Sequence, residues 1–178
     1  TTGNDSPAIL LQSVGGGGGW IGDVGGNASL GSTQIGSTNA GSIDAAVNYK
    51  AIQTTGINST GILAQSIAGG GGFTGRTAGN ALTLGATIAG NSTSNAGDVK
   101  LTNNGSINTF GVSTAAIIAQ SIGGGGGASA TSAGDTIRLG AISTATGTGS
   151  LPTVQSGNVS VTNTQNLGTN ALGSVGLL

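Results

Sequence analysis

Residues 63–67 read Leu-Ala-Gln-Ser-Ile, and four glycines follow at 69–72. Equivalent stretches occur at 10–14 and at 118–122, each directly before a run of five glycines. The glutamines of the three stretches, Gln12, Gln65 and Gln120, therefore recur at nearly equal intervals. A nearly fixed period in this range is typical of proteins built from stacked structural repeats.

Two further motifs keep the same order and nearly the same spacing. The first motif contains Gly followed by Asn or Asp and, a few residues later, Leu-Gly; it lies at 26–31, 79–85 and 134–140. The second motif has the form Gly-Asx-Val-x-Val/Leu-Thr-Asn and lies at 97–103 and 157–163. A weaker version of the second motif begins at Gly41-Ser42-Ile43. The sequence therefore predicts one domain over 1–178, made of tandem repeats of about 54 residues. The expected repeats are 1–54, 55–108 and 109–168, with the start of a further one at 169–178.

The two ends align with the interior of a repeat. The segment 1–12 matches 109–120, and Leu178 falls where Ile118 stands. The chain contains no Met and no segment that resembles a signal peptide. We therefore expect it to be an excerpt of a longer repeat array.

Short apolar pairs with a period of two indicate strands with one buried face, as in Val99/Leu101, Ile137/Leu139 and Val159/Val161. No stretch carries a helical stripe, so we predict an all-β fold, specifically a β-solenoid resembling a right-handed β-helix. Strand anchors recur about every 20 residues, which suggests two to three coils per repeat. A β-sandwich is the alternative, but it leaves the repeat period unexplained. Positive mean hydropathy and a net charge of −1 argue against disorder.

Composition excludes several functions. The four Lys and Arg residues are too few to hold nucleic acid or an anionic membrane, and the longest apolar stretches are too short to insert into a bilayer. His and Cys are absent, which removes zinc sites and the usual nucleophile–base pairs. We therefore predict no enzymatic activity, no catalytic, cofactor-binding or metal site, and no cofactor.

The glycine runs do not form a phosphate loop, because Trp20, Phe73 and Ala128 follow them where that motif requires Lys and Ser or Thr. We expect a wide turn or a close backbone approach. Extended strands, or polyglycine helices packed side by side, remain alternatives.

The acidic residues are isolated in the sequence: Asp5, Asp23, Asp44, Asp98 and Asp135. Asparagine stands in sister repeats where Asp98 and Asp135 lie. Turns in which an Asx side chain bonds its own backbone are therefore expected, rather than a catalytic or calcium site.

Two other polar features bear on function. A Ser-Lys pair with Lys50 or Lys100 is formally available, but both lysines lie in strand-like segments and are expected to be solvated.

The strands around Gln12, Gln65 and Gln120 carry apolar residues on both faces. Either a flanking part of the chain or a partner is expected to cover the second face.

The Ala-Gln-Ser-Ile motif, its glycine run and the Gly/Asn/Ser/Thr-rich, Cys-free array resemble passenger-region repeats of large bacterial autotransporters and filamentous surface adhesins. The resemblance implies export to the extracellular surface of a Gram-negative cell, a β-helical stalk, and a role in adhesion, filament or biofilm assembly. Expected partners are neighbouring repeats or copies of the same protein, surface glycans and host surfaces. Two alternatives are a glycan-processing β-helix and an ice-binding solenoid; the latter needs stacked Thr-x-Thr motifs, and the single dense run is 144–148.

Overall fold

The computed structural model describes residues 1–31, 36–47, 50–79, 81–132, 136–140, 142–143 and 150–178. All regular structure in these residues is β-strand, and neighbouring strands in every sheet run parallel. The predicted all-β class is confirmed. The threonine run at 144–148 and Asp135 lie outside the described residues.

The chain passes through seven parallel sheets in turn, and we call one passage through them a circuit. Within each sheet, strands from successive circuits lie side by side. The sheets comprise β1 (Ile9–Val14), β7 (Ile62–Ile67), β14 (Ala115–Ile122) and β21 (Val175–Leu177); β2 (Gly18–Ile21), β8 (Gly71–Thr77) and β15 (Gly126–Ser132); β3 (Ala28–Leu30), β9 (Ala81–Leu84) and β16 (Thr136–Leu139); β10 (Thr87–Ile88) and β17 (Ile142–Ser143); β4 (Thr38–Asn39), β11 (Thr93–Asn95) and β18 (Thr153–Gln155); β5 (Ile43–Val47), β12 (Val99–Asn103) and β19 (Val159–Asn163); and β6 (Ile52–Thr54), β13 (Ile107–Thr109) and β20 (Leu167–Thr169).

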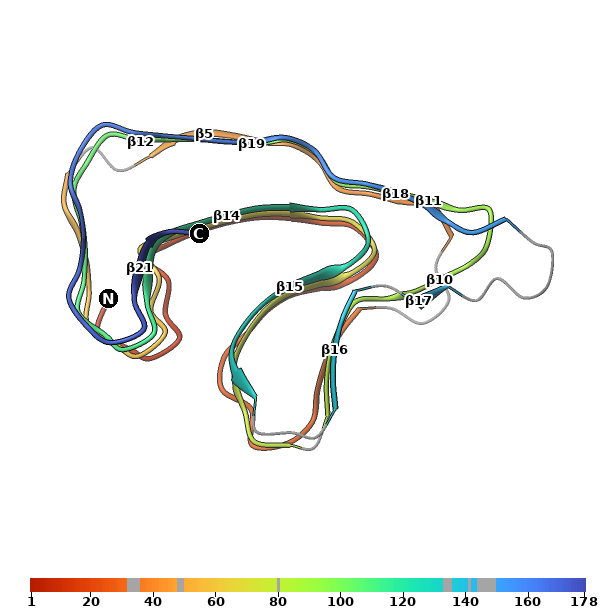
Figure 1. The fold of residues 1–178 in the computed structure, drawn as a ribbon, viewed down its shortest axis with the longest axis horizontal. Coiled ribbons are helices and arrows are strands. Elements are labelled where there is room, and N and C mark those ends of the chain that lie inside the picture. The colour runs from red at the N-terminus through yellow and green to blue at the C-terminus, as the bar shows by residue number, and fades with distance from the viewer. Residues whose placement is uncertain (32–35, 48–49, 80, 133–135, 141, 144–149) are drawn as a thin grey trace.

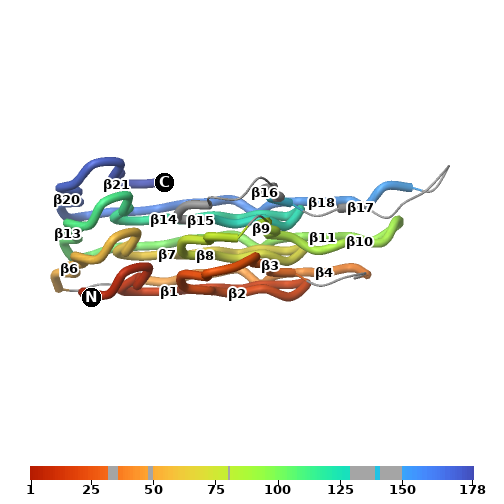
Figure 2. The backbone as a smooth tube through the Cα atoms, turned by 90° about the horizontal axis from the view of Figure 1, so that it is seen from below, coloured from red at the N-terminus to blue at the C-terminus, as the bar shows by residue number. Residues whose placement is uncertain are grey.

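Successive circuits follow nearly the same path and lie on top of one another (Figures 1 and 2). Ile9 pairs with Ile62, and Ile62 with Ile117, so the sequence repeats align residue by residue. The predicted alignment of Leu178 with Ile118 is confirmed, because Ile117 pairs with Leu177.

The expectation of two to three coils per repeat is wrong, because one repeat makes one circuit. Strands that follow one another along the chain are different sides of a wide, flattened circuit and do not stack on each other (Figure 1). Each of them instead pairs with its counterpart one repeat away: Val99, for example, pairs with Ile43 and Val159. Each strand therefore stacks on the equivalent strand of the neighbouring repeat, so a position that faces the interior in one circuit faces it in every circuit.

The main apolar core lies between the sheet of β5, β12 and β19 and the sheet of β1, β7 and β14. Strand β12 shows the expected alternation, since Val99 and Leu101 are fully buried and Lys100 between them is exposed. A second cluster joins β3 and β9 through Leu82 and Leu84. The interior is thus divided into thin aliphatic layers, which suits a sequence with four aromatic residues.

Strand β7 is buried on both faces. Ile62 and Ala64 belong to the main core, while Leu63 on the opposite face packs with Phe73 of β8. For β7, the second face is therefore covered by the chain itself, which is the first of the two predicted arrangements.

The serine of the Gln-Ser motif joins two sheets where the circuit narrows. Ser66 Oγ donates to the carbonyl of Gly41 (2.9 Å) and accepts from the N–H of Gly97 (2.9 Å). Ser121 repeats this one circuit later, with the carbonyl of Gly97 and the N–H of Gly157, both at 2.8 Å. Each serine thus satisfies backbone groups from two successive circuits.

Candidate functional site

The glycine runs bring two sheets face to face. In the second circuit, Gly69 to Gly72 have φ values of +79°, +75°, +127° and +144°, which favour glycine. A Cβ on Gly71 would lie 1.9 Å from the carbonyl oxygen of Gly126. The runs therefore form a turn and the start of a strand, with close backbone approach. Polyglycine helices are excluded for these residues, because such a helix keeps one φ along its length, whereas φ here changes from +75° to +144°.

The three motif glutamines form a side-chain ladder between these two sheets. Gln12 Nε2 donates to Gln65 Oε1 at 2.8 Å, and Gln65 Nε2 donates to Gln120 Oε1 at 2.7 Å. Gln65 is fully buried. The ladder is a structural element that satisfies polar groups inside the stack.

A corner before β7 and β14 carries a column of left-handed residues. Asp5, Asn58, Ser113 and Gly173 have φ values of +49°, +54°, +56° and +69°, and they occupy equivalent positions in successive circuits. Three of them donate their N–H to the next circuit: Asp5 to Ile57 at 2.9 Å, and Asn58 to Val112 and Ser113 to Leu172 at 3.0 Å. Asn and Asp tolerate this conformation better than most residues, which explains their presence here.

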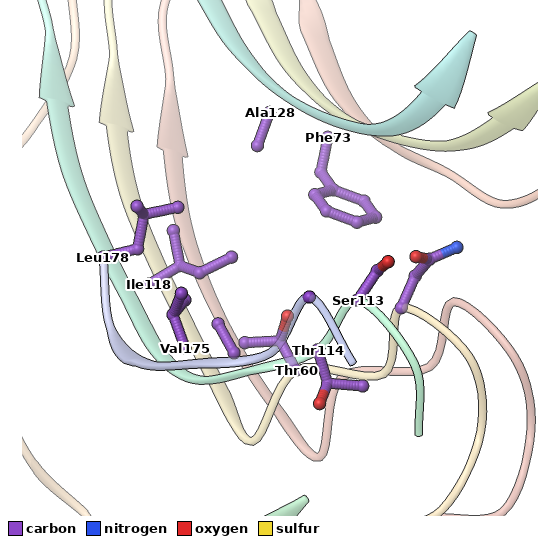
Figure 3. Close-up of a pocket in the computed structure, with 11 residues that line it drawn as sticks. Thr60, Phe73, Ser113, Thr114, Ile118, Ala128, Val175 and Leu178 are labelled. Carbon is purple, nitrogen blue, oxygen red and sulfur yellow. The ribbon is translucent and has the colours of Figure 1, made fainter. Parts of the chain in front are cut away.

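A column of decreasing side-chain size faces this corner. Trp20 pairs with Phe73, and Phe73 pairs with Ala128 in the third circuit. Where Ala128 replaces a ring, a pocket of about 250 Å³ opens (Figure 3). Its lining residues come from both columns and from the strands between them: Asn58, Thr60, Phe73, Ser113, Thr114, Ala115, Ile118, Ala128, Gly173, Val175 and Leu178.

One lining side chain has an unsatisfied polar atom. Asn58 is 4% exposed, and its Nδ2 donates to Asp5 Oδ1 at 3.2 Å. Its Oδ1 has no hydrogen-bond partner among the described residues. Orphaned buried acceptors are uncommon in folded proteins, and the surrounding chain shields this one from solvent.

The structure brings together two acidic residues that are isolated in the sequence. The carboxyl groups of Asp5 at the corner and Asp23 after β2 lie close enough to each other to share a proton. The Arg76 backbone N–H donates to Asp23 Oδ1 at 2.7 Å, and its guanidinium forms an ion pair with Oδ2 at 3.1 Å. Burial, together with the hydrogen bond to Asp23, raises the pKa of Asp5 to about 6. The same hydrogen bond and the Arg76 groups lower the pKa of Asp23.

This carboxyl pair does not have the geometry of a glycosidase site. Retaining and inverting enzymes hold their two carboxyl groups about 5 Å or more apart, so that the sugar or a water fits between them. Asp5 and Asp23 instead lie within reach of a shared proton, with no room for a sugar or a water between them. The pair therefore joins the corner to the segment after β2.

Replacing Asp5 by asparagine is expected to stabilise the protein at neutral pH. A folded-state pKa of about 6 exceeds the ordinary 3.8, so the Asp5 contribution to stability is lost as pH rises from about 4 to 6. Asparagine needs no proton to bond Asp23, and Asn58 shows that it fits the same backbone conformation. Equilibrium denaturation should show an unfolding free energy higher by about 1–3 kcal/mol at pH 7 and little changed at pH 4.

Asp44→Asn is the matched control, because this exposed carboxylate pairs with Lys100 at 3.2 Å on the surface. It should leave the pH dependence between 4 and 6 as in the parent. An Asp5→Asn profile that runs parallel to the parent over this range would contradict the shared-proton assignment.

The other charged residues serve the backbone or the surface. Asp98 Oδ1 accepts from the N–H of Asn158 at 2.7 Å, so this Asx side chain bonds the next circuit and not its own backbone, contrary to the prediction. The reason is that the backbone of the next repeat stacks directly beside it. Lys50 and Lys100 are both exposed, as predicted; Lys100 lies on β12, whereas Lys50 lies between β5 and β6. Within the described ranges, no three acidic side chains gather in a group that could bind a metal.

Exposed apolar side chains form a ridge next to the left-handed corner. Ile57, Val112 and Leu172 each precede a corner residue, and they are 37%, 47% and 85% exposed. The backbone bonds of the corner place them in successive circuits, one above another. We call these three residues the apolar ridge.

Comparisons of the chain with protein-family models, curated proteins and solved structures found no match. Among the described residues, no helix has the length and apolar character needed to span a bilayer.

Proposed function

We propose that this chain is a segment of a β-solenoid that serves as a stalk or fibre element on a bacterial cell surface and takes part in adhesion or filament assembly. The observation that carries the proposal is the in-register parallel stacking of successive repeats, from β1 through β7 and β14 to β21. Each added repeat lengthens such a stack along its axis and contacts only its neighbours, so the stack can reach the length that a stalk requires. A right-handed path is proposed because crossovers between parallel strands are almost always right-handed.

Two surface features support assembly. The outermost strands of each sheet, such as β5 and β19, have one edge without a strand partner in the described chain. Such edges are templates for further strands, from another repeat or another copy. The apolar ridge adds a contiguous exposed patch, which is the kind of surface that mediates contacts with other molecules. A net charge of −1 opposes close approach only weakly.

Edge pairing is tested by sedimentation velocity over a range of protein and salt concentrations. We expect species larger than the monomer that grow with concentration. Val161→Lys should shift the distribution toward monomer, because Val161 packs against the main core and a charge pointing inward blunts a strand edge.

The matched control is Ser160→Lys, which adds the same charge on the exposed side of the same strand. It should associate like the parent, and circular dichroism should confirm that both variants remain folded. A parent chain that stays monomeric under all conditions would remove the support for assembly through these edges.

A further inference from the structure

We propose that the apolar ridge is a lateral contact surface on which the same ridge of a second copy of this chain packs, so that two solenoids lie side by side. This inference rests on the proposed function, because lateral contacts of this kind join stalks into a fibre. It names the partner and the residues of the contact, and it is separate from pairing at the strand edges.

The ridge is exposed in the middle of the stack as well as near its end. The backbone bonds of the corner place Ile57 and Leu172 on either side of Val112 along the axis, yet Val112 is 47% exposed. Ile57 lies in turn between Asn4 and Val112, since its N–H donates to Asn4 Oδ1 at 3.0 Å. Phe110, two residues before Val112, is 46% exposed and widens the patch. Ile57 and Val112 already have neighbours above and below, so their exposed surface faces sideways and further circuits at either end of the stack leave it open.

The spacing of the ridge matches a second stack of strands. Successive ridge residues belong to successive circuits, and hydrogen-bonded strands lie about 4.8 Å apart. An extended peptide presents side chains on one face about every 6.8 Å, and a helix about every 5.4 Å, so the mismatch with either partner grows with each circuit. A second solenoid has the same spacing as the first. Side chains of its ridge can therefore fit between those of the first over any number of circuits.

The surroundings of the ridge carry no charge. Residues 55–58, 110–113 and 170–173 include no acidic or basic side chain. A partner with phosphate groups, such as a nucleic acid or an anionic lipid surface, therefore has no cation to bind there. Exposed apolar side chains among neutral polar groups match a surface of the same composition, and a second copy supplies one. The net charge of −1 means that two copies repel each other only weakly.

The contact that this chain can make is small. A stable interface buries about 800 Å² on each partner and involves about 20–30 residues a side. The ridge and Phe110 together supply four apolar side chains, so they hold two copies only weakly. Further circuits with an apolar residue at the ridge position add to the same contact, so the attraction increases with the length of the array. A method that traps a transient complex is therefore the appropriate test.

The chain contains no Cys, so a single introduced thiol reports contact between two copies of the full chain. Val112→Cys places the thiol in the middle of the ridge, beside its own counterpart whether the two solenoids run parallel or antiparallel. The control is Thr93→Cys, because Thr93 is exposed on β11, far from the corner (Figure 1). Non-reducing electrophoresis should show disulfide-linked dimers of Val112→Cys forming about tenfold faster, after each rate is divided by the reaction rate of that thiol with a small disulfide.

Second substitutions in the Val112→Cys protein identify the surface. Ile57→Asp places like charges across the contact and should lower the rate to that of Thr93→Cys, whereas Thr93→Asp adds the same charge elsewhere and should leave it unchanged. Val161→Lys, which blunts a strand edge, should also leave the rate unchanged. Circular dichroism should confirm that every variant remains folded.

The proposal is overturned if the corrected rates of Val112→Cys and Thr93→Cys agree, or if Ile57→Asp does not slow the reaction. A rate that falls with Val161→Lys would assign the contact to the strand edges and overturn the ridge as well. Sedimentation tests the edges and disulfide formation tests the ridge, so failure of one proposal is distinguishable from failure of the other.

Discussion

Gly72→Ala is expected to prevent the chain from reaching its native fold. A Cβ at this position would lie 1.8 Å from the carbonyl oxygen of Gly19, and the backbone has φ +144°. The obstacle is backbone in an adjacent circuit, which cannot move aside without breaking the pairing of β2 with β8. We expect a loss of about 5 kcal/mol or more, comparable to the whole stability of many domains.

The measurement is far-ultraviolet circular dichroism with denaturant unfolding. Gly26→Ala is the control, because no atom lies within 4 Å of its added Cβ and its φ is not left-handed. This variant should differ from the parent by less than about 0.5 kcal/mol. A Gly72→Ala protein with parental stability would show that β8 does not approach β2 as closely as described.

Gln65→Leu is expected to destabilise the protein by about 2–4 kcal/mol, since unsatisfied buried polar groups cost more than a lost hydrogen bond between exposed groups. The substitution preserves most of the side-chain volume. It leaves the Gln12 amide nitrogen with only its longer bond to the Gly19 carbonyl, at 3.5 Å, and the Gln120 carbonyl oxygen without its partner. Urea unfolding monitored by circular dichroism measures the change.

Two companion variants separate polarity from packing. Gln53→Leu changes an exposed glutamine on β6 and should have little effect. The triple replacement of Gln12, Gln65 and Gln120 by leucine removes donors and acceptors together, so it should recover much of the stability lost in the single variant. If the triple variant is less stable by the sum of three single losses, the ladder interpretation is wrong.

The repeat register was predictable because identical motifs at one spacing can align in few ways. Gln12, Gln65 and Gln120 fall on one ladder, as their shared motif indicates. The number of circuits per repeat was not predictable from strand spacing alone. Spacing shows where strands lie along the chain, whereas pairing depends on which side chains match. The sequence did contain evidence for one circuit per repeat. The motifs at 63–67 and 97–103 differ from each other, but each recurs in the equivalent position of the other repeats.

The pocket and the carboxyl pair depend on contacts across the circuit. Asp5 and Asp23 are separated along the chain by β1 and β2, so no local pattern reveals that their side chains meet. The pocket did leave a signal, since Trp20, Phe73 and Ala128 follow the three glycine runs in order of decreasing size. Once the register is known, that series predicts a missing ring in the third circuit.

The one-circuit repeat also has a consequence for how the chain folds. Each strand pairs with one that lies a whole repeat away, as for Trp20 with Phe73 and Val99 with Val159, so little of the structure is local. Folding dominated by such distant contacts is slow, because a long loop must close before any pairing is gained. The first two circuits must fold together, because each supplies the strand partners of the other. Every later circuit can then pair with the exposed strand edges of a circuit that is already folded. We therefore expect a lag set by the first pair of circuits, followed by growth one repeat at a time.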